Sequence, residues 1–108
     1  MQDLELIAFQ IISNVGAARS SFLEAISAAR AGDYERAEKL ILKGDKDFLT
    51  GHKAHQQLLT DEAGGGTANN MNLLLTHAED QLMSAESFKI LAKEFINIYQ
   101  RLEKAERK

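Results

Sequence analysis

The chain has 108 residues, contains neither cysteine nor proline, and carries a formal net charge of −3 at pH 7. The absence of cysteine excludes a disulfide scaffold, a cysteine zinc site and a thiolate nucleophile. The mildly acidic charge argues against a nucleic-acid binder, and a domain of this size leaves little volume for an internal catalytic cavity. Any chemistry is therefore expected on the surface or between subunits.

The amino-terminal residues, MQDLELIAFQIIS, begin acidic and contain neither a basic segment nor a long apolar run. They predict no signal peptide and no membrane span, and together with the absence of cysteine they indicate a cytoplasmic location.

The first predicted helix covers about residues 3–31. Its apolar residues recur with alternating steps of four and three, which keeps one stripe facing a partner helix; they are Leu4, Ala8, Ile11, Val15, Ala18, Phe22, Ala25 and Ala29. A patch of small residues around Gly16 interrupts the heavier ones. Because glycine inside a helix costs about 1 kcal/mol relative to alanine, we expect another helix to approach closely there.

The second predicted helix covers about residues 34–61. Gly32 can adopt the left-handed conformation that ends the first helix, and Asp33 is suited to cap the second. We expect a bend or local fraying near Gly44 and Gly51. The expected inward residues are Tyr34, Ala37, Ile41, Phe48, Ala54, Leu58 and Leu59.

Residues 63–69 contain three consecutive glycines and are interpreted as a flexible linker. A phosphate-binding loop is the weaker interpretation, because no strand precedes the glycines and no Lys-Ser/Thr pair follows them. Asn69 or Asn70 is then expected to cap the third helix.

The third predicted helix covers about residues 70–105. Its apolar positions are Met71, Leu74, Leu75, Ala78, Leu82, Ala85, Phe88, Leu91, Ala92, Phe95, Ile98, Tyr99 and Leu102. This exceeds what one three-helix bundle can cover, so we expect several subunits to pack together. The basic tail from Arg101 to Lys108 is interpreted as a solvated helix end.

His52 and His55 lie three residues apart, so they share a helix face and form a possible metal-binding pair. No carboxylate follows at helical spacing until Asp61 or Glu62. Ordinary surface or packing histidines are therefore the favoured interpretation.

His77 is followed by Asp80 and Gln81 on nearly the same helix face. In one interpretation His77 and Asp80 satisfy each other in a helix interface, because an unpaired buried polar group costs about 1–3 kcal/mol. In the other, His77 is a nucleophile, since imidazole attacks phosphorus or carbonyl centres near neutral pH. The residue pattern alone leaves both interpretations open and favours the first.

Four segments carry a resemblance to a known family: IISNVGAARS at 11–20, AARAGDYERAEKL at 28–40, H-(x)5-LL-(x)3-AG at 52–64 and LLLTHAEDQLM at 73–83. Their order and spacing resemble the enzyme IIA component of the lactose/cellobiose class of the bacterial phosphotransferase system, across essentially the whole chain. The resemblance implies an all-α, antiparallel three-helix bundle that assembles as a parallel homotrimer.

The resemblance also implies an activity and a site. His77 would accept a phosphoryl group from the phosphocarrier protein HPr, as a tele-phosphohistidine, and pass it to a cysteine of the cognate enzyme IIB for uptake of a β-linked disaccharide. Asp80 would meet its two symmetry mates around a cation on the threefold axis, and Mg²⁺ suits three converging carboxylates.

Two positions depart from the family pattern. Gln81 stands where many members have a second histidine, and it can hydrogen-bond a phosphoryl oxygen without supplying positive charge. His55 stands where relatives often have glutamine. One hypothesis is that His55 compensates electrostatically for Gln81.

Two other classes of function compete with the carrier. A helical adaptor or regulatory trimer would bind a partner protein in its inter-subunit groove without becoming phosphorylated. A small metal-dependent hydrolase using His77 and Asp80 is weaker, because two ligands leave most of a coordination shell empty.

Overall fold

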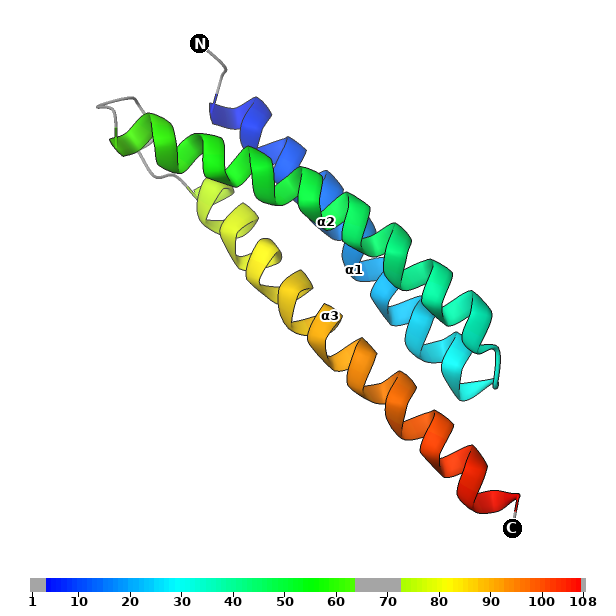
Figure 1. Cartoon of the computed structure of the whole chain (residues 1–108). Coiled ribbons are helices and arrows are strands. Elements are labelled where there is room, and N and C mark those ends of the chain that lie inside the picture. The colour runs from blue at the N-terminus through cyan, green and yellow to red at the C-terminus, as the bar shows by residue number, and fades with distance from the viewer. Residues whose placement is uncertain (1–3, 64–72, 108) are drawn as a thin grey trace.

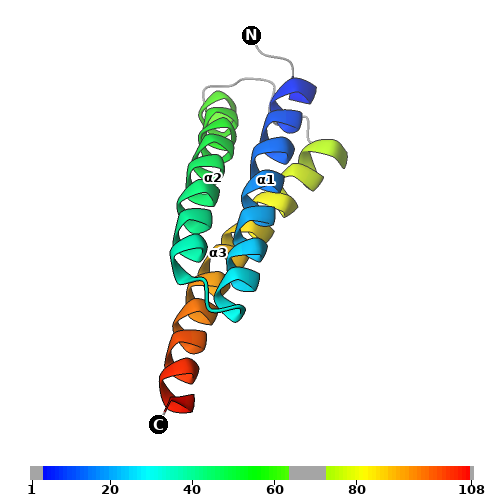
Figure 2. The ribbon, with the colours of Figure 1, turned by 90° about the vertical axis from the view of Figure 1, so that its right-hand side faces the viewer.

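The computed structural model describes residues 4–63 and 73–107, which form three α-helices. α1 spans Leu4–Arg30, α2 spans Tyr34–Ala63 and α3 spans Leu73–Glu106. α2 runs back antiparallel along α1, and α3 returns in the direction of α1 and projects past the α1–α2 turn (Figures 1 and 2). The all-α three-helix bundle is thus confirmed, whereas the predicted linker over 63–69 and the Asn69 or Asn70 cap fall almost wholly outside the described residues.

A glycine cap and an aspartate cap build the turn between α1 and α2. Gly32 adopts a φ of 85°, the left-handed conformation that side chains disfavour. The amide of Asp33 donates to the carbonyl of Ala28 at 2.9 Å, and the amide of Gly32 donates to that of Ala29 at 2.9 Å. The amide of Arg36 donates to Asp33 Oδ1 at 3.1 Å. These bonds satisfy polar groups at both helix ends and confirm the predicted turn.

The core runs along the inner faces of the helices in two adjoining clusters. The cluster near the start of α1 and α3 consists of Ile7, Ala8, Ile11, Val15, Leu58, Leu75, Ala78, Leu82 and Ala85. The cluster near the α1–α2 turn consists of Ala18, Phe22, Ala25, Ala28, Ala29, Ala37, Ile41, Ala92 and Ile96. The predicted stripe of α1 is buried apart from half-buried Leu4, which makes α1 the central helix of the bundle.

Two glycines of α2 admit side chains from α1. A Cβ atom at Gly44 would lie 2.5 Å from the Phe22 ring, and one at Gly51 would lie 2.6 Å from Val15 Cγ1. The fraying expected here is wrong, because α2 is continuous through both glycines and α1 packs against them. The close approach expected at Gly16 is also wrong within the described chain, since no atom lies within 4 Å of a Cβ built there.

Large apolar side chains remain exposed on all three helices. Leu59, predicted to face inward, is 50% exposed. On α3 most of the exposed large apolar residues follow one another along one side of the helix; they are Leu73, Leu91, Phe95, Ile98 and Leu102, whereas Met83 and Ile90 are exposed on a neighbouring side. Phe95 and Leu102 thus belong to the surplus of apolar surface that the sequence predicts on the third helix, and that surplus is confirmed.

α1 is the one described helix that is long and apolar enough to cross a membrane, with a mean hydropathy of 1.2 over 18 residues. A central helix of a bundle passes the same test of length and composition, and the inner face of α1 packs against α2 and α3. The criterion is therefore weak evidence for a membrane span here.

Candidate functional site

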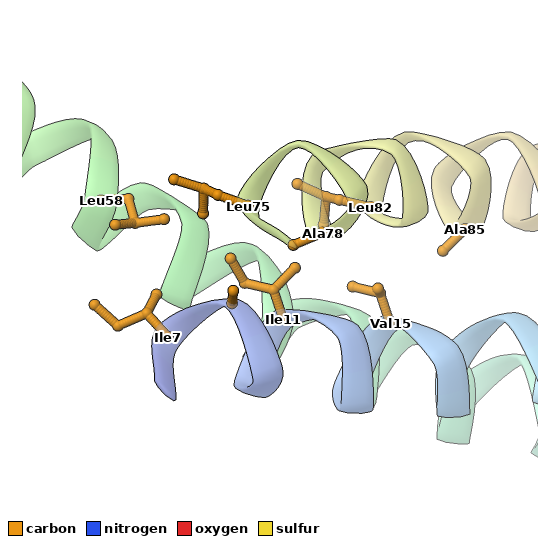
Figure 3. Packing of buried hydrophobic residues seen from close by; sticks show 9 residues of the cluster. Ile7, Ile11, Val15, Leu58, Leu75, Ala78, Leu82 and Ala85 are labelled. Carbon is orange, nitrogen blue, oxygen red and sulfur yellow. The ribbon is translucent and has the colours of Figure 1, made fainter. Parts of the chain in front are cut away.

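His77 lies on the outward side of α3. The buried residues around it, Leu75, Ala78 and Leu82, point toward α1 and α2 (Figure 3). His77 falls between these positions on the helix and is exposed. Its imidazole makes no hydrogen bond or ion pair with any residue in the described ranges 4–63 and 73–107. The imidazole is therefore accessible to a reagent or a partner protein.

Asp80 follows His77 by three residues and is also exposed. Its carboxylate makes no hydrogen bond or ion pair with another described residue, so the pairing of His77 with Asp80 is not observed in the single chain. Gln81, one residue further, is half-buried. All three residues lie within about one helical turn, with His77 and Asp80 sharing the outward side of α3.

Asp80 belongs to a longitudinal stripe, which we call the α3 stripe: Leu73, Asp80, Leu91, Ile98 and Leu102. Steps of seven, eleven, seven and four residues return to nearly the same side of an α-helix. The four apolar members are between 48% and 87% exposed. The stripe thus presents a carboxylate near one end and a row of uncovered apolar side chains beyond it.

The structure pairs His55 with a residue that sequence reasoning missed. His55 Nε2 lies 3.3 Å from Glu79 Oε1, joining α2 to α3. Residues two apart on a helix point about 200° apart, so Glu79 and Gln81 lie on opposite flanks of α3. The hypothesis that His55 compensates for Gln81 therefore has no contact to support it. The sequence held no signal for the pair, because it depends on the rotation of α2 against α3.

His52 and His55 have different partners. The ring of His52 stacks on Phe48, with centroids 6.0 Å apart and planes inclined by 20°. His55 instead points to Glu79. Within residues 4–63 and 73–107, no three or more His, Asp or Glu side chains gather in a way that could hold a metal ion. Packing roles for this pair, the favoured interpretation, agree with these contacts.

The basic tail is a solvated helix end as far as it is described. Arg107 Nη2 donates to Glu103 Oε1 at 2.7 Å, one turn earlier on α3.

A hydrogen bond from Tyr34 to Glu103, together with partial desolvation, raises the pKa of the Tyr34 hydroxyl above its ordinary value of 10.0. Glu103 therefore ties the start of α2 to the last turns of α3.

The three-helix bundle with an exposed histidine on its longest helix agrees with a comparison to known families. Residues 6–100 match the family described as "PTS system, Lactose/Cellobiose specific IIA subunit". The chain belongs to this family, the phosphotransferase components that carry phosphoryl groups in sugar uptake.

Curated relatives and solved structures agree with this assignment. The chain is 40% identical over 101 residues to the lichenan-specific phosphotransferase enzyme IIA component of Bacillus subtilis, covering 94% of this chain and 91% of the relative. It is 39% identical to a lactose-specific EIIA component of Streptococcus mutans, covering 93% and 95%. The crystal structure of the cellobiose-specific enzyme IIA from Bacillus anthracis superposes with a TM-score of 0.89 at 36% identity, covering 95% and 94%.

A complex is also among the similar structures. The solution structure of the IIA(chitobiose)–HPr complex from Escherichia coli contains a chain with a TM-score of 0.75 and 26% identity, covering 95% of this chain and 99% of that one. In that structure the relative is bound to HPr.

Proposed function

We propose that the protein is a phosphoryl carrier that accepts a phosphoryl group from phospho-HPr on His77 and passes it to a cysteine of the cognate enzyme IIB. The exposure of His77 carries the proposal. An acceptor that exchanges phosphoryl groups with two proteins must be reachable by both, and His77 is uncovered and unpaired among the described residues. The HPr complex of a relative supports the choice of donor.

The transfer exchanges one bond to phosphorus for another. His77 Nε2 attacks the phosphorus of phospho-HPr, the bond from phosphorus to the HPr donor atom breaks, and a tele-phosphohistidine forms. A thiolate of enzyme IIB then attacks the same phosphorus and releases neutral His77. Phosphoryl transfer depends on positioning and charge stabilisation more than on covalent help, and half-buried Gln81, four residues from His77, can donate a hydrogen bond to a phosphoryl oxygen.

The α3 stripe supports assembly as a parallel homotrimer. Four exposed apolar side chains in line on one helix favour burial against the same helix of other copies. Around a threefold axis the stripes of three α3 helices would meet one another. His77 lies about 60° around the helix from Asp80, so it would face the groove between neighbouring subunits, where a docking protein can reach it.

In this trimer Asp80 would supply one carboxylate from each subunit to the axis. One chain cannot form a cation site with Asp80 alone, since no further His, Asp or Glu side chains join it among the described residues. Three symmetry-related carboxylates would offer the hard oxygen ligands that Mg²⁺ prefers. The ion would relieve the repulsion of the three charges, so Asp80 and Mg²⁺ are assigned a structural role.

The transported sugar is proposed to be a β-linked disaccharide. The names of the relatives give lichenan, lactose and oligo-β-mannoside as their sugars. In this proposal the chain supplies the phosphoryl acceptor, and it meets HPr and enzyme IIB on the cytoplasmic side of the membrane.

Reconstitution tests the proposal. Incubation with enzyme I, HPr and phosphoenolpyruvate should raise the intact mass of the protein by about 80 Da, one phosphoryl group, and acid should reverse the gain. Omission of HPr is the control and should give no gain. An unchanged mass with active phospho-HPr present would overturn the carrier and favour an adaptor.

A further inference from the structure

α2 carries a row of exposed side chains on the side that faces away from the bundle. The members recur in steps of four, three and four residues, which keeps them on one side of the helix; they are Leu42, Lys46, Leu49 and Lys53. Leu42 is 69% exposed and Leu49 is 51% exposed. Exposed Lys43 flanks the row, and we call these five residues the α2 face.

The opposite side of α2 holds the helix in the bundle. Gly44, Gly51 and Leu58 are buried there. Gly44 and Gly51 each lie two residues after a leucine of the α2 face, which is about 200° around the helix. The packing of α2 against α1 and α3 therefore leaves the α2 face uncovered.

The exposed charge on this part of α2 is uniformly positive. Among residues 39–53, all exposed charged residues are lysines, namely Lys39, Lys43, Lys46 and Lys53. Lys39 pairs with Glu35 at 3.4 Å. The ammonium groups of the other three make no hydrogen bond or ion pair with a residue in 4–63 or 73–107. Because the whole chain carries a net charge of −3, this positive row is a local arrangement.

The carboxylates of the same segment do not neutralise the row. Asp45 and Asp47 are both half-buried. Asp45 Oδ1 lies 2.8 Å from Lys89 Nζ, so its charge is directed toward α3. The three unpaired lysines are thus left to attract a negative charge from outside the chain.

An open cleft between α2 and α3 borders the α2 face. Its lining combines apolar and charged side chains: Glu38, Ile41, Leu42, Lys93 and Ile96. Lys93 is exposed and adds a positive charge from α3, while Glu38 lies one turn before Leu42. Lys93 is sixteen residues beyond His77, which is about 160° around α3. The α2 face and the proposed phosphoryl acceptor therefore lie on opposite sides of the bundle.

The surface that fits the α2 face is anionic and extended. A helix ridge is convex and cannot enclose a small ligand, whereas its ammonium groups attract a wide negative surface at close range. The cytoplasmic leaflet of a membrane presents such a surface through its acidic phospholipids. Leucine side chains between the lysines can enter the layer of headgroups. The alternation of leucine and lysine thus matches the apolar and the charged part of one lipid surface.

We propose that the α2 face is a docking surface for anionic phospholipids, which holds the protein at the cytoplasmic side of the membrane. The inference goes beyond the proposed phosphoryl transfer and does not depend on it. In the proposed trimer α2 lies on the far side of α3 from the axis, so the α2 face stays uncovered. His77 stays free for HPr and enzyme IIB while α2 contacts lipid.

Co-sedimentation of the full chain with lipid vesicles tests the inference. The probes are vesicles of phosphatidylcholine alone and vesicles with equal parts of phosphatidylcholine and phosphatidylglycerol. At about 50 mM NaCl the partition coefficient should be at least about tenfold higher for the anionic vesicles, since each lysine near such a surface strengthens binding about fivefold. At about 500 mM NaCl most of this preference should disappear, because salt screens the charges.

Two double variants locate the contact. Lys46→Gln with Lys53→Gln should weaken binding to the anionic vesicles about 25-fold, about fivefold for each lysine. Arg101→Gln with Lys104→Gln removes two exposed charges near the end of α3 and should change binding less than about twofold. Both variants should keep the helix content of the wild type by circular dichroism and accept a phosphoryl group as the wild type does, since neither pair lies near His77.

A tryptophan placed on the α2 face reports contact with lipid, because the chain has no tryptophan of its own. The fluorescence of Leu49→Trp should shift to shorter wavelength when anionic vesicles are added, as the indole leaves water. Phe9→Trp is the matched control. Phe9 is 52% exposed, close to the 51% of Leu49, but it lies on α1, and the emission of this variant should not shift.

The outcomes separate the inference from the proposed function. Equal sedimentation of the wild type with both kinds of vesicle would exclude a role of the lysines. Binding to neither would overturn the lipid surface and leave an acidic partner protein as the counterpart of the α2 face. Unchanged binding after loss of Lys46 and Lys53, or equal shifts for the two tryptophan variants, would place the contact elsewhere. A wild type that binds anionic vesicles but gains no phosphoryl group would refute the carrier alone.

Discussion

The outward side of α3 changes character along its length. After the exposed Leu73, the first half presents His77 and Asp80, whose polar side chains are exposed and make no hydrogen bond or ion pair with other described residues. The second half presents Leu91, Ile98 and Leu102, which are apolar and about half exposed. The inner side is apolar throughout, so the difference does not arise from folding of the single chain. One helix thus combines a region suited to chemistry with a region suited to assembly.

The largest expected effect comes from placing charge in the apolar half. Ile98→Lys should convert the proposed trimer, about 36 kDa for three copies of the 12.0 kDa chain, into monomers, because three lysines would meet on its axis. Light scattering after size-exclusion chromatography gives the mass. Gln100→Lys is the control, since Gln100 is exposed about 200° around the helix and the trimer should persist. If the Ile98→Lys variant is still a trimer, assembly does not depend on the α3 stripe.

The sequence predicts part of the contrast between the polar and the apolar half of α3. The heptad spacing predicted an apolar surplus on the third helix, and the surplus is there. It did not show which apolar residues stay uncovered: Phe95 and Leu102 fit the inward pattern as well as Leu82 and Ala92 do. The choice depends on how far α3 extends past the α1–α2 turn and how it rotates against α1, and both are set by packing.

The same limit applies to the site. His77, Asp80 and Gln81 could be singled out from local spacing, because residues three and four apart must share a helix face. The contact of Glu79 could not be predicted in this way, since its partner His55 lies 24 residues away on another helix. The fraying predicted at Gly44 and Gly51 is absent for a related reason: a glycine weakens an isolated helix, but here each one makes room for a side chain of α1.

A substitution in α2 should destabilise the bundle without altering either half of the outward side. Gly44→Ala would force a Cβ atom against the Phe22 ring, which should cost about 1–3 kcal/mol of unfolding free energy. Gly16→Ala is the matched control, because open space and helical geometry should give a gain of about 0.4–1 kcal/mol. Urea titration monitored by circular dichroism measures both, and a stabilised Gly44→Ala variant would refute the tight contact.

Removal of divalent cations should affect the polar half alone. With EDTA the wild-type protein should melt a few degrees lower than with Mg²⁺ if the proposed trimer binds the ion, because bound ligand stabilises the state that binds it. Asp80→Asn removes both the repulsion and the ligand, so its melting temperature should be the same in EDTA and Mg²⁺. Equal melting temperatures for the wild type under both conditions would argue against an axial cation.

The smallest expected effect is a change in the pKa of Tyr34, which contacts Glu103 near the end of α3. The hydrogen bond to Glu103 and partial desolvation raise the pKa of Tyr34, so the folded state favours the protonated phenol. The resulting stabilisation is present below the ordinary tyrosine pKa and is lost as pH rises through the raised value. Ultraviolet titration should show one tyrosine ionising late, and Glu103→Gln should lower its pKa. Two tyrosines that titrate together near the ordinary value would contradict the contact.

The central claim is that His77, among the three histidines of the chain, carries the phosphoryl group. Its most direct test is intact-mass measurement of His52→Gln, His55→Gln and His77→Gln after incubation to completion with enzyme I, HPr and phosphoenolpyruvate. The account predicts a gain of about 80 Da in the first two variants and none in the third. A phosphorylated His77→Gln variant, or an unmodified His52→Gln or His55→Gln variant that is folded and trimeric, would contradict it.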